Sequence, residues 1–326
     1  MTTTTESTTR LDRGRLWTRF GIVFVLAALW VIGIALVPNF SNPDNLTSIL
    51  RQSSFVGITA IGMTMAIIAG LFDLSVGSTL ALAAWASVLT ASATGSPLAA
   101  LLAAVAIGMI VGSINGFFVT VVRIPAFITT LGMLFIVAGV TLILTSGEAA
   151  RYNGPEFIWW GNAAFGFVPV PFAVFILCAL VGSAVLRFTS FGRYLFAIGS
   201  NAPAAHVAGV PINRATFLVF VVVGVFVGIS AMLLGSRLYS AGPGLEAGFE
   251  LNVIACVVLG GTRLSGGRGT IVGMVAAAIL FTTLGNLLNL LHTDPFVQRV
   301  ATGLVLVTAL SIEGIRQRLA ERTGSE

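Results

Sequence analysis

Hydrophobic residues fall into ten runs along the chain, separated by mostly short polar segments. Runs of about 17–25 apolar residues are long enough to cross a bilayer as helices. We expect helices at residues 20–37, 46–70, 76–94, 97–121, 126–146, 168–187, 214–236, 251–262, 270–291 and 296–315. The run at 251–262 is too short to span and predicts a broken or re-entrant helix. The pattern therefore predicts an all-α polytopic membrane protein with about ten transmembrane helices.

The composition supports a membrane protein. Of the 326 residues, 56% are hydrophobic and only 9% are charged, whereas soluble domains carry about 25% charged residues. This excludes most cytosolic, secreted and nucleic-acid-binding classes, so the formal charge of +5 does not indicate a nucleic-acid partner. All 17 basic residues are Arg. Without lysine, the chain cannot supply a phosphate-binding Walker lysine or a Schiff-base lysine.

The arginines predict how the chain is oriented. With the N-terminus in the cytoplasm and ten alternating spans, 13 arginines face the cytoplasm and 4 face outward, which satisfies the positive-inside rule. Nine spans would place the cluster Arg316–Arg322 outside. We therefore expect two cytoplasmic termini: a tail at 1–19, a transmembrane domain at 20–315 and a second tail at 316–326.

Two segments resemble each other at an offset of 190 residues. Gly70–Gly77 reads GLFDLSVG and Gly260–Gly267 reads GGTRLSGG, with four identical positions. Each copy follows one apolar run and precedes another, and in this alignment Arg263 replaces Asp73. Internal repeats with interrupted helices are typical of transporters, where helix ends line the pathway.

Several polar residues interrupt the apolar pattern. An ionisable residue at membrane depth indicates a functional site, but Asp73 and Ser75 could instead cap the helix beginning near Val76. Asp73 could also pair with Arg263. The asparagines in apolar runs either line a polar pathway or form hydrogen bonds between helices. The candidate pathway or gate residues are Asp73, Ser75, Asn115, Asn286 and Asn289.

Other features favour packing over chemistry. Cys178 and Cys256 lie in apolar runs, and the two histidines are far apart, so neither a metal site nor a catalytic set is expected. Gly108-Met109-Ile110-Val111-Gly112 and Gly224-Val225-Phe226-Val227-Gly228 are small-xxx-small pairs that suit close helix packing. We expect that packing to occur within the chain.

The cytoplasmic segment 188–213 differs from the other connections. Asn201 suits an N-cap, Pro203 suits the first helical turn and Gly209 suits a C-terminal stop. The segment therefore predicts a short helix capped at both ends on the cytoplasmic face. It could be a docking element or a structured linker, and the residues alone favour neither.

Four ordered motifs, at 62–78, 115–132, 192–209 and 250–270, carry a family resemblance. In them the chain resembles the permease subunits of bacterial ABC importers for monosaccharides, the ribose/xylose/galactoside permease family. The resemblance covers about residues 45–315. The sequence departs from the family pattern at Leu71-Phe72, Ser200, Asn252 and Arg263, and these changes bear on substrate identity.

The resemblance implies a set of partners in the bacterial plasma membrane. An extracytoplasmic sugar-binding protein delivers a monosaccharide or related polyol, a second permease subunit completes a homo- or heterodimer, and ATPase subunits bind ATP on the cytoplasmic face. This chain would need no cofactor of its own and would be no enzyme. The implied ATPase-coupling residues in the cytoplasmic segment are Gly192, Arg193, Asn201, Ala204, Ala205 and Gly209. Glu246 and Glu250 of the outer loop are candidates for docking the binding protein.

Two other functions remain as alternatives. An ion-coupled secondary transporter of a small polar solute would favour ionisable groups near the bilayer centre. Here the acids cluster at the ends of the predicted spans, and Asp73 is the only deep candidate. A membrane-embedded enzyme would need a convergent catalytic set, which the sequence does not show.

Overall fold

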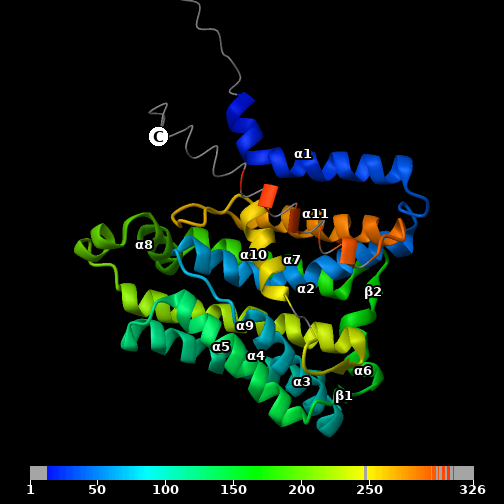
Figure 1. Ribbon diagram of the computed structural model, residues 1–326, viewed down its shortest axis with the longest axis horizontal. Helices are drawn as coiled ribbons and strands as arrows, with labels where there is room; N and C mark the ends of the chain where they lie inside the picture. The colour runs from blue at the N-terminus through cyan, green and yellow to red at the C-terminus, as the bar shows by residue number, and fades with distance from the viewer. Residues whose placement is uncertain are drawn as a thin grey trace, which may run out of the picture.

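The computed structural model describes residues 13–311, apart from 246–247, 295, 299, 301–302, 305–306 and 309–310. Helices dominate this part of the chain (Figure 1). In chain order they are α1 (Arg13–Leu36), α2 (Pro43–Ile68), α3 (Val76–Thr94), α4 (Pro97–Phe117), the π-helix η1 (Phe118–Val122), α5 (Ala126–Thr145), α6 (Pro155–Asn162), α7 (Val170–Phe188), α8 (Ser190–Val207), α9 (Ile212–Leu238), α10 (Phe249–Leu259) and α11 (Ile271–Leu290).

Among the described residues, six helices are long and apolar enough to cross a membrane: α3, α4 with η1, α5, α7, α9 and α11. Helix α10 has 11 residues and is therefore about 16 Å long, short of the ~30 Å hydrocarbon core, as its short apolar run predicts. Helix α1 begins at Arg13, inside the segment expected as a tail. The run at 296–315 and the tail at 316–326 lie largely or wholly outside the described residues. The count of ten spans and the side of the termini stay predictions.

Helix α2 forms the centre of the bundle and lies between α9 and α11 in Figure 1. From Ser53 to Ile68 every side chain except that of Val56 is buried. A helix that is buried on all sides can be apolar all round. Small residues let its neighbours approach closely, because a Cβ at Gly62 would lie only 2.9 Å from the Cα of Val223 on α9.

Helices α4 and α9 pack backbone against backbone. A Cβ added to Gly108 would overlap the carbonyl group of Gly224, and a Cβ at Gly224 would overlap that of Gly108. A Cβ at Gly228 would lie 2.5 Å from the Cα of Val105. The glycine pairs of the sequence thus mediate packing within the chain, as expected.

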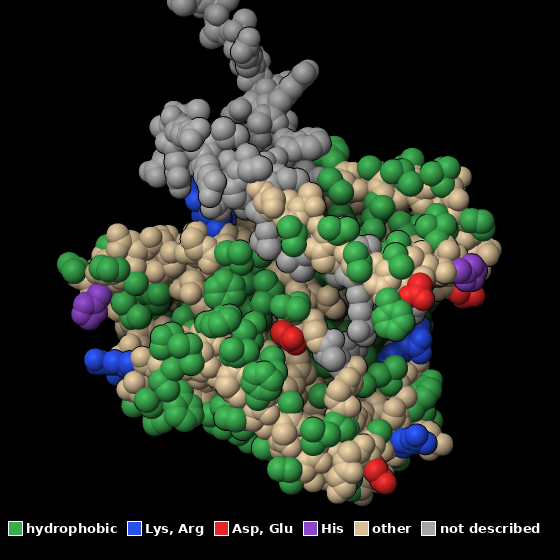
Figure 2. Space-filling view, in the orientation of Figure 1, with side chains coloured by type: hydrophobic (Ala, Val, Ile, Leu, Met, Phe, Trp, Pro, Cys, Tyr) green, Lys and Arg blue, Asp and Glu red, His purple; other side chains and the backbone are tan. Residues whose placement is uncertain are grey.

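The surface of the bundle is mostly apolar. Figure 2 shows hydrophobic side chains spread over one face, with basic side chains toward its two ends. The exposed large residues on α4 and α5 include Leu102, Ile110, Phe135 and Ile143. An apolar outer face over the span helices suits contact with lipid.

Two short antiparallel ladders lie near one end of the bundle, beside α6, and α8 lies at the other end (Figure 1). β1 (Ala150–Arg151) pairs with β4 (Ser240–Ala241), and β2 (Ala164–Phe165) pairs with β3 (Val168–Pro169). The sequence predicted an all-α chain and missed these strands, because two residues are too few for an alternating pattern. Segments 147–167 and 237–250 therefore meet at the end opposite α8, in agreement with their predicted placement on the other side from 188–213.

Candidate functional site

Three of the predicted pathway residues come together where α2 passes into α3. Asp73 and Ser75 lie in the connection between these helices, and Asn115 lies in the last turn of α4. Ser75 is the N-cap residue of α3. All three side chains are at least 97% removed from solvent, with Asp73 3%, Ser75 1% and Asn115 0% exposed. Buried polar groups at such a site must bond one another.

Hydrogen bonds join these three residues into one cluster. Oδ1 of Asp73 accepts from the N–H of Ser75 at 2.9 Å and from its hydroxyl at 2.6 Å. Nδ2 of Asn115 donates to Oγ of Ser75 at 2.9 Å and lies 3.4 Å from both carboxylate oxygens. Among the described residues Arg263 is not a partner of Asp73. No side chain accepts from the first amides of α3, so the predicted helix cap at Asp73 or Ser75 is wrong. Asp73 instead bonds Ser75, the residue just before the helix. The Asp73 cluster (Asp73, Ser75, Asn115) fixes α3 against α4.

The two repeat segments share the same helix-ending geometry, but in a different register from the sequence alignment. The N–H of Leu71 donates to the carbonyl oxygen of Ala66 at 2.9 Å. In the second segment the N–H of Thr262 donates to the carbonyl oxygen of Val257 at 3.2 Å. Gly70 and Gly261 both have positive φ, at 77° and 84°. These pairs are 191 residues apart, so Asp73 corresponds to Leu264. The expected charge reversal at Arg263 is therefore not part of the structural repeat.

A contact that the sequence did not predict joins α8 to the end of α2 and to the second repeat segment. The N–H of Gly267 donates to the carbonyl oxygen of Ile68 at 2.8 Å. Gly199 of α8 lies directly over this bond, since a Cβ there would overlap the oxygen of Ile68 and lie 2.6 Å from the nitrogen of Gly267. No local pattern in the sequence marks Gly199, because its partners are distant along the chain.

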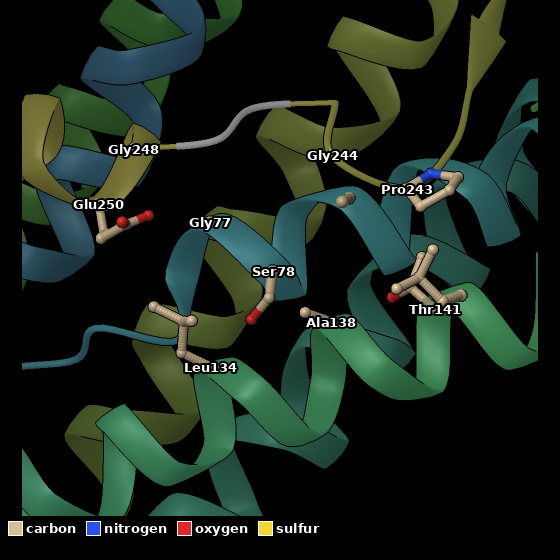
Figure 3. Close-up of a pocket in the computed structure, with 11 residues that line it drawn as sticks. Gly77, Ser78, Leu134, Ala138, Thr141, Pro243, Gly244, Gly248 and Glu250 are labelled. Atoms are coloured by element: carbon tan, nitrogen blue, oxygen red, sulfur yellow. The ribbon is translucent and has the colours of Figure 1, made fainter. Parts of the chain in front are cut away.

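A cavity of about 480 Å³ lies next to the Asp73 cluster. Figure 3 shows it between the start of α3, the middle of α5 and the segment that leads into α10. Its polar side chains are Ser78, Thr141 and Glu250. The hydroxyl of Ser78 donates to the carbonyl oxygen of Ser75 at 3.0 Å, so the cavity wall is anchored on the cluster. Ser78 and Thr141 were not predicted, because single hydroxyls are common in apolar helices.

The other two predicted pathway residues lie elsewhere. Asn286 of α11 and Asn45 of α2 exchange side-chain hydrogen bonds of 2.7 and 3.1 Å. Asn289 accepts from the side chain of Gln298 at 2.8 Å. Asn286 thus forms a hydrogen bond between helices, which was the alternative to lining a pathway. The five predicted residues do not form one site.

Helix α8 occupies the segment expected to be mostly a loop. It is 18 residues long, with a break at Asn201, whose φ and ψ are −162° and 93°. Oδ1 of Asn201 accepts from the N–H of Ala204 at 3.0 Å, and Gly209 has a φ of +78° just beyond the end. The predicted N-cap and stop are confirmed. The first part of the segment is helical as well, because Thr189 caps it through the N–H of Gly192.

The coupling residues on α8 divide into exposed and buried positions. Arg193, Asn201, Ala204 and Gly209 are exposed, whereas Gly192 and Ala205 are buried. A Cβ at Gly192 would overlap the backbone of Leu186. Only the exposed residues can touch a partner directly.

Only one of the two acids predicted to dock the binding protein lies in the described part of the chain. Glu246 lies outside the described residues. Glu250 is in the first turn of α10, where the helix dipole stabilises negative charge, and its carboxylate points toward the start of α3 (Figure 3). It is half-buried and lines the cavity.

Comparisons with known proteins agree on one class. The model of the family described as "Branched-chain amino acid transport system / permease component" matches residues 45–310. The L-arabinose transport system permease protein AraH of Escherichia coli (strain K12) is 36% identical over 95% of this chain and 94% of its own length. The ribose import permease protein RbsC of Bacillus subtilis (strain 168) is 37% identical over 90% and 92%. RbsC of Escherichia coli (strain K12) is 35% identical over 90% and 93%.

Proposed function

The chain belongs to the family of branched-chain amino acid transport system permease components, and from this membership we propose how it works as the permease subunit of a sugar importer. It is a multi-pass protein of the bacterial plasma membrane. The observation that carries the sugar assignment is the identity of 35–37% with arabinose and ribose permeases over at least 90% of this chain. Although the family description names amino acids, relatives aligned over nearly their whole length are the stronger guide to the solute.

The transported solute is a monosaccharide or a related polyol. The apolar outer faces of α4 and α5 suit lipid, so the solute crosses where polar groups are gathered inside the protein. The Asp73 cluster and the neighbouring cavity form such a gathering in the described part of the chain. In this proposal Asp73, Ser75 and Asn115 hold the gate of the pathway.

ATP is hydrolysed on a separate ATPase subunit. A chain without lysine lacks the residue with which a Walker loop holds phosphate. Helix α8 is the surface on which that subunit acts. Two observations support this. Val207, the last residue of α8, is 89% exposed, and Gly199, on the other side of the break at Asn201, packs on the end of α2 and on Gly267 of the second repeat segment.

The end of the bundle opposite α8 receives an extracytoplasmic sugar-binding protein. There α6 and the β1–β4 ladder gather the segments 147–167 and 237–250 on one surface. Trp159 and Trp160 of α6 are both exposed at this end, as suits the membrane interface. A second permease subunit completes the pathway.

Reconstitution tests the proposal. The chain, its ATPase and its binding protein are placed in proteoliposomes, and uptake of labelled L-arabinose and ribose is measured with and without ATP. We expect uptake of one of these sugars that requires ATP and survives collapse of ion gradients. Uptake that needs an ion gradient and no ATP would instead establish the secondary transporter.

The role of α8 is tested by one exposed substitution and one control. Ala204→Glu places charge on the exposed surface of α8 and should lower ATP-dependent uptake at least tenfold while the protein still inserts. Ala204→Ser keeps the same position small and uncharged and should leave uptake unchanged. Normal uptake with Ala204→Glu would remove α8 from the proposed contact.

A further inference from the structure

Among the described residues that line the cavity beside α3, Glu250 is the one with an ionisable side chain. Glu250 aims its carboxylate toward the first turn of α3, where Ser78 lies (Figure 3). Among the described residues, the carboxylate has neither a hydrogen-bond partner nor an ion-pair partner. An unpaired charge away from bulk water is costly, so a half-buried carboxylate that faces a cavity is poised to accept hydrogen bonds from a ligand.

The remaining walls suit a small neutral molecule. Leu134, Ala138, Leu142 and Pro243 supply apolar surface, and the hydroxyls of Ser78 and Thr141 supply hydrogen-bonding groups. Both hydroxyls already donate, to the carbonyl oxygens of Ser75 and Val137. Their free lone pairs therefore accept, as the carboxylate does. A wall made of acceptors selects a ligand that brings donors.

We propose that this cavity holds the solute during transport and that Glu250 binds two neighbouring hydroxyl groups of a neutral sugar. The inference rests on the proposed function and deepens it, since it places the solute and names its chemistry. A carboxylate has two oxygens and accepts from two donors at once, which matches a pair of hydroxyls on adjacent carbons. The C–H faces of the sugar pack on Leu134 and Pro243.

The negative charge of Glu250 also excludes anionic ligands from the cavity. None of the described residues lining it is Arg or His, so an anionic sugar acid would meet a carboxylate without compensation. The volume of about 480 Å³ lies within the range of 300–1,000 Å³ that is usual for small-molecule sites. Sugar acids should therefore be rejected by charge, although they would fit by size.

The Asp73 cluster and Glu250 have different roles at the cavity. Ser78 is bonded to the carbonyl oxygen of Ser75, and Ser75 is bonded to Asp73. The cluster is therefore a positioning element that holds one wall of the cavity, whereas Glu250 touches the sugar. Glu250 becomes a pathway residue instead of part of a docking rim.

The test uses the reconstituted importer with labelled L-arabinose, ribose and the sugar acid D-glucuronate. Glu250→Gln keeps the size of the side chain but removes its charge, which weakens hydrogen bonds from hydroxyls. We expect the KM for the transported sugar to rise about tenfold, equivalent to about 1.4 kcal/mol. The preference for neutral sugar over D-glucuronate should fall by a similar factor.

The matched control is Asp44→Asn. Asp44 also lies in the first turn of a helix, α2, but it is exposed and does not line the cavity. Any effect of losing charge at a helix start appears in both variants, so only a site effect separates them. The KM and the selectivity of Asp44→Asn should equal those of the unaltered importer.

A second pair of variants covers the case in which Glu250→Gln fails to insert. Ala138→Phe fills the cavity from α5, whereas Gly139→Phe adds the same ring at the next position, where a Cβ meets nothing within 4 Å. Uptake should be lost in the first and kept in the second. Unchanged KM and selectivity in Glu250→Gln, or full uptake in Ala138→Phe, would overturn the site. Absence of sugar uptake by the unaltered importer would instead overturn the proposed function.

Discussion

The backbone N–H of Gly267 donates a hydrogen bond of 2.8 Å to the carbonyl oxygen of Ile68. Ile68 is the last residue of α2, and the final carbonyl groups of a helix need partners from outside it. The bond therefore ties the connection after α10 to the end of α2, and Gly199 of α8 covers it. The connection carrying Asp73 begins only two residues later, at Gly70. We therefore expect that a movement of α8 would reach the Asp73 cluster through these backbone contacts.

Gly199→Ala should break this link. Its new Cβ would overlap a carbonyl oxygen that belongs to a buried helix end and cannot move aside. We expect sugar uptake to fall at least tenfold while basal ATP hydrolysis by the assembled importer continues. Both rates are measured in proteoliposomes. Gly285→Ala, whose Cβ would meet nothing within 4 Å, is the control and should transport normally. Full transport by Gly199→Ala would show that the junction does not carry the motion.

Gly224→Ala should destabilise the packing of α9 on α4. In an isolated helix the change gains about 1 kcal/mol. Here the new methyl group would overlap the backbone of Gly108, and overpacking costs about 1–3 kcal/mol. The melting temperature of the purified protein in detergent should therefore fall. Gly139→Ala, in open space on α5, should leave it equal or higher. A melting temperature of Gly224→Ala that matches that of Gly139→Ala would contradict the close approach.

The predicted orientation can be tested by labelling cysteines from outside the cell. Positions 153 and 206 are both exposed and lie in segments at opposite ends of the bundle. Cys178 is 9% and Cys256 0% exposed, so the native cysteines can stay. A membrane-impermeant thiol reagent should label Asn153→Cys and spare His206→Cys. Position 206 is preferable to 201, because the side chain of Asn201 caps a helix. External labelling at 206 would reverse the topology.

The sequence predicted the elements whose signals are local. The helix at 76–94 was expected with the bounds that the structure shows, because an apolar run starts after Ser75 and stops at Gly95, which has a φ of +69°. The cap at Asn201 and the stop at Gly209 follow from the side-chain chemistry of single residues. The meeting of Asp73, Ser75 and Asn115 was anticipated only as a set of candidates.

Contacts between distant segments could not be predicted in this way. Asn45 and Asn286 are 241 residues apart, and no pattern in either apolar run indicates that the two side chains meet. The need for glycine at position 199 arises from Ile68 and Gly267, which reach it from two other segments. Glu250 was predicted as an outer docking residue, because the alternation of predicted spans places the loop 237–250 outside. The direction of its side chain depends on where α10 starts in the folded bundle.

The last prediction concerns Asp73, whose partners are now defined. Its Oδ1 accepts from the N–H and the hydroxyl of Ser75. In Asp73→Asn the amide oxygen can accept both bonds, because it has two lone pairs. The other oxygen faces Nδ2 of Asn115, and the new amide group would place donor against donor. Asn115 can turn its own Oδ1, which has no partner among the described residues, toward that group.

Asp73→Asn should therefore insert normally and retain substantial transport with an unchanged sugar preference. Asp73→Leu removes both carboxylate oxygens and leaves the buried N–H and hydroxyl of Ser75 without their acceptor, although Asn115 keeps its bond to Oγ of Ser75. Each buried group left unpaired costs about 1–3 kcal/mol, so this variant should misfold or stall. Membrane yield, melting temperature and the KM values for L-arabinose and ribose distinguish the outcomes. A positioning role predicts that Asn affects stability more than KM, the reverse of the pattern expected for Glu250→Gln. If Asp73→Asn folds well but changes which sugar is carried, Asp73 contacts the solute and the cluster is part of its binding site.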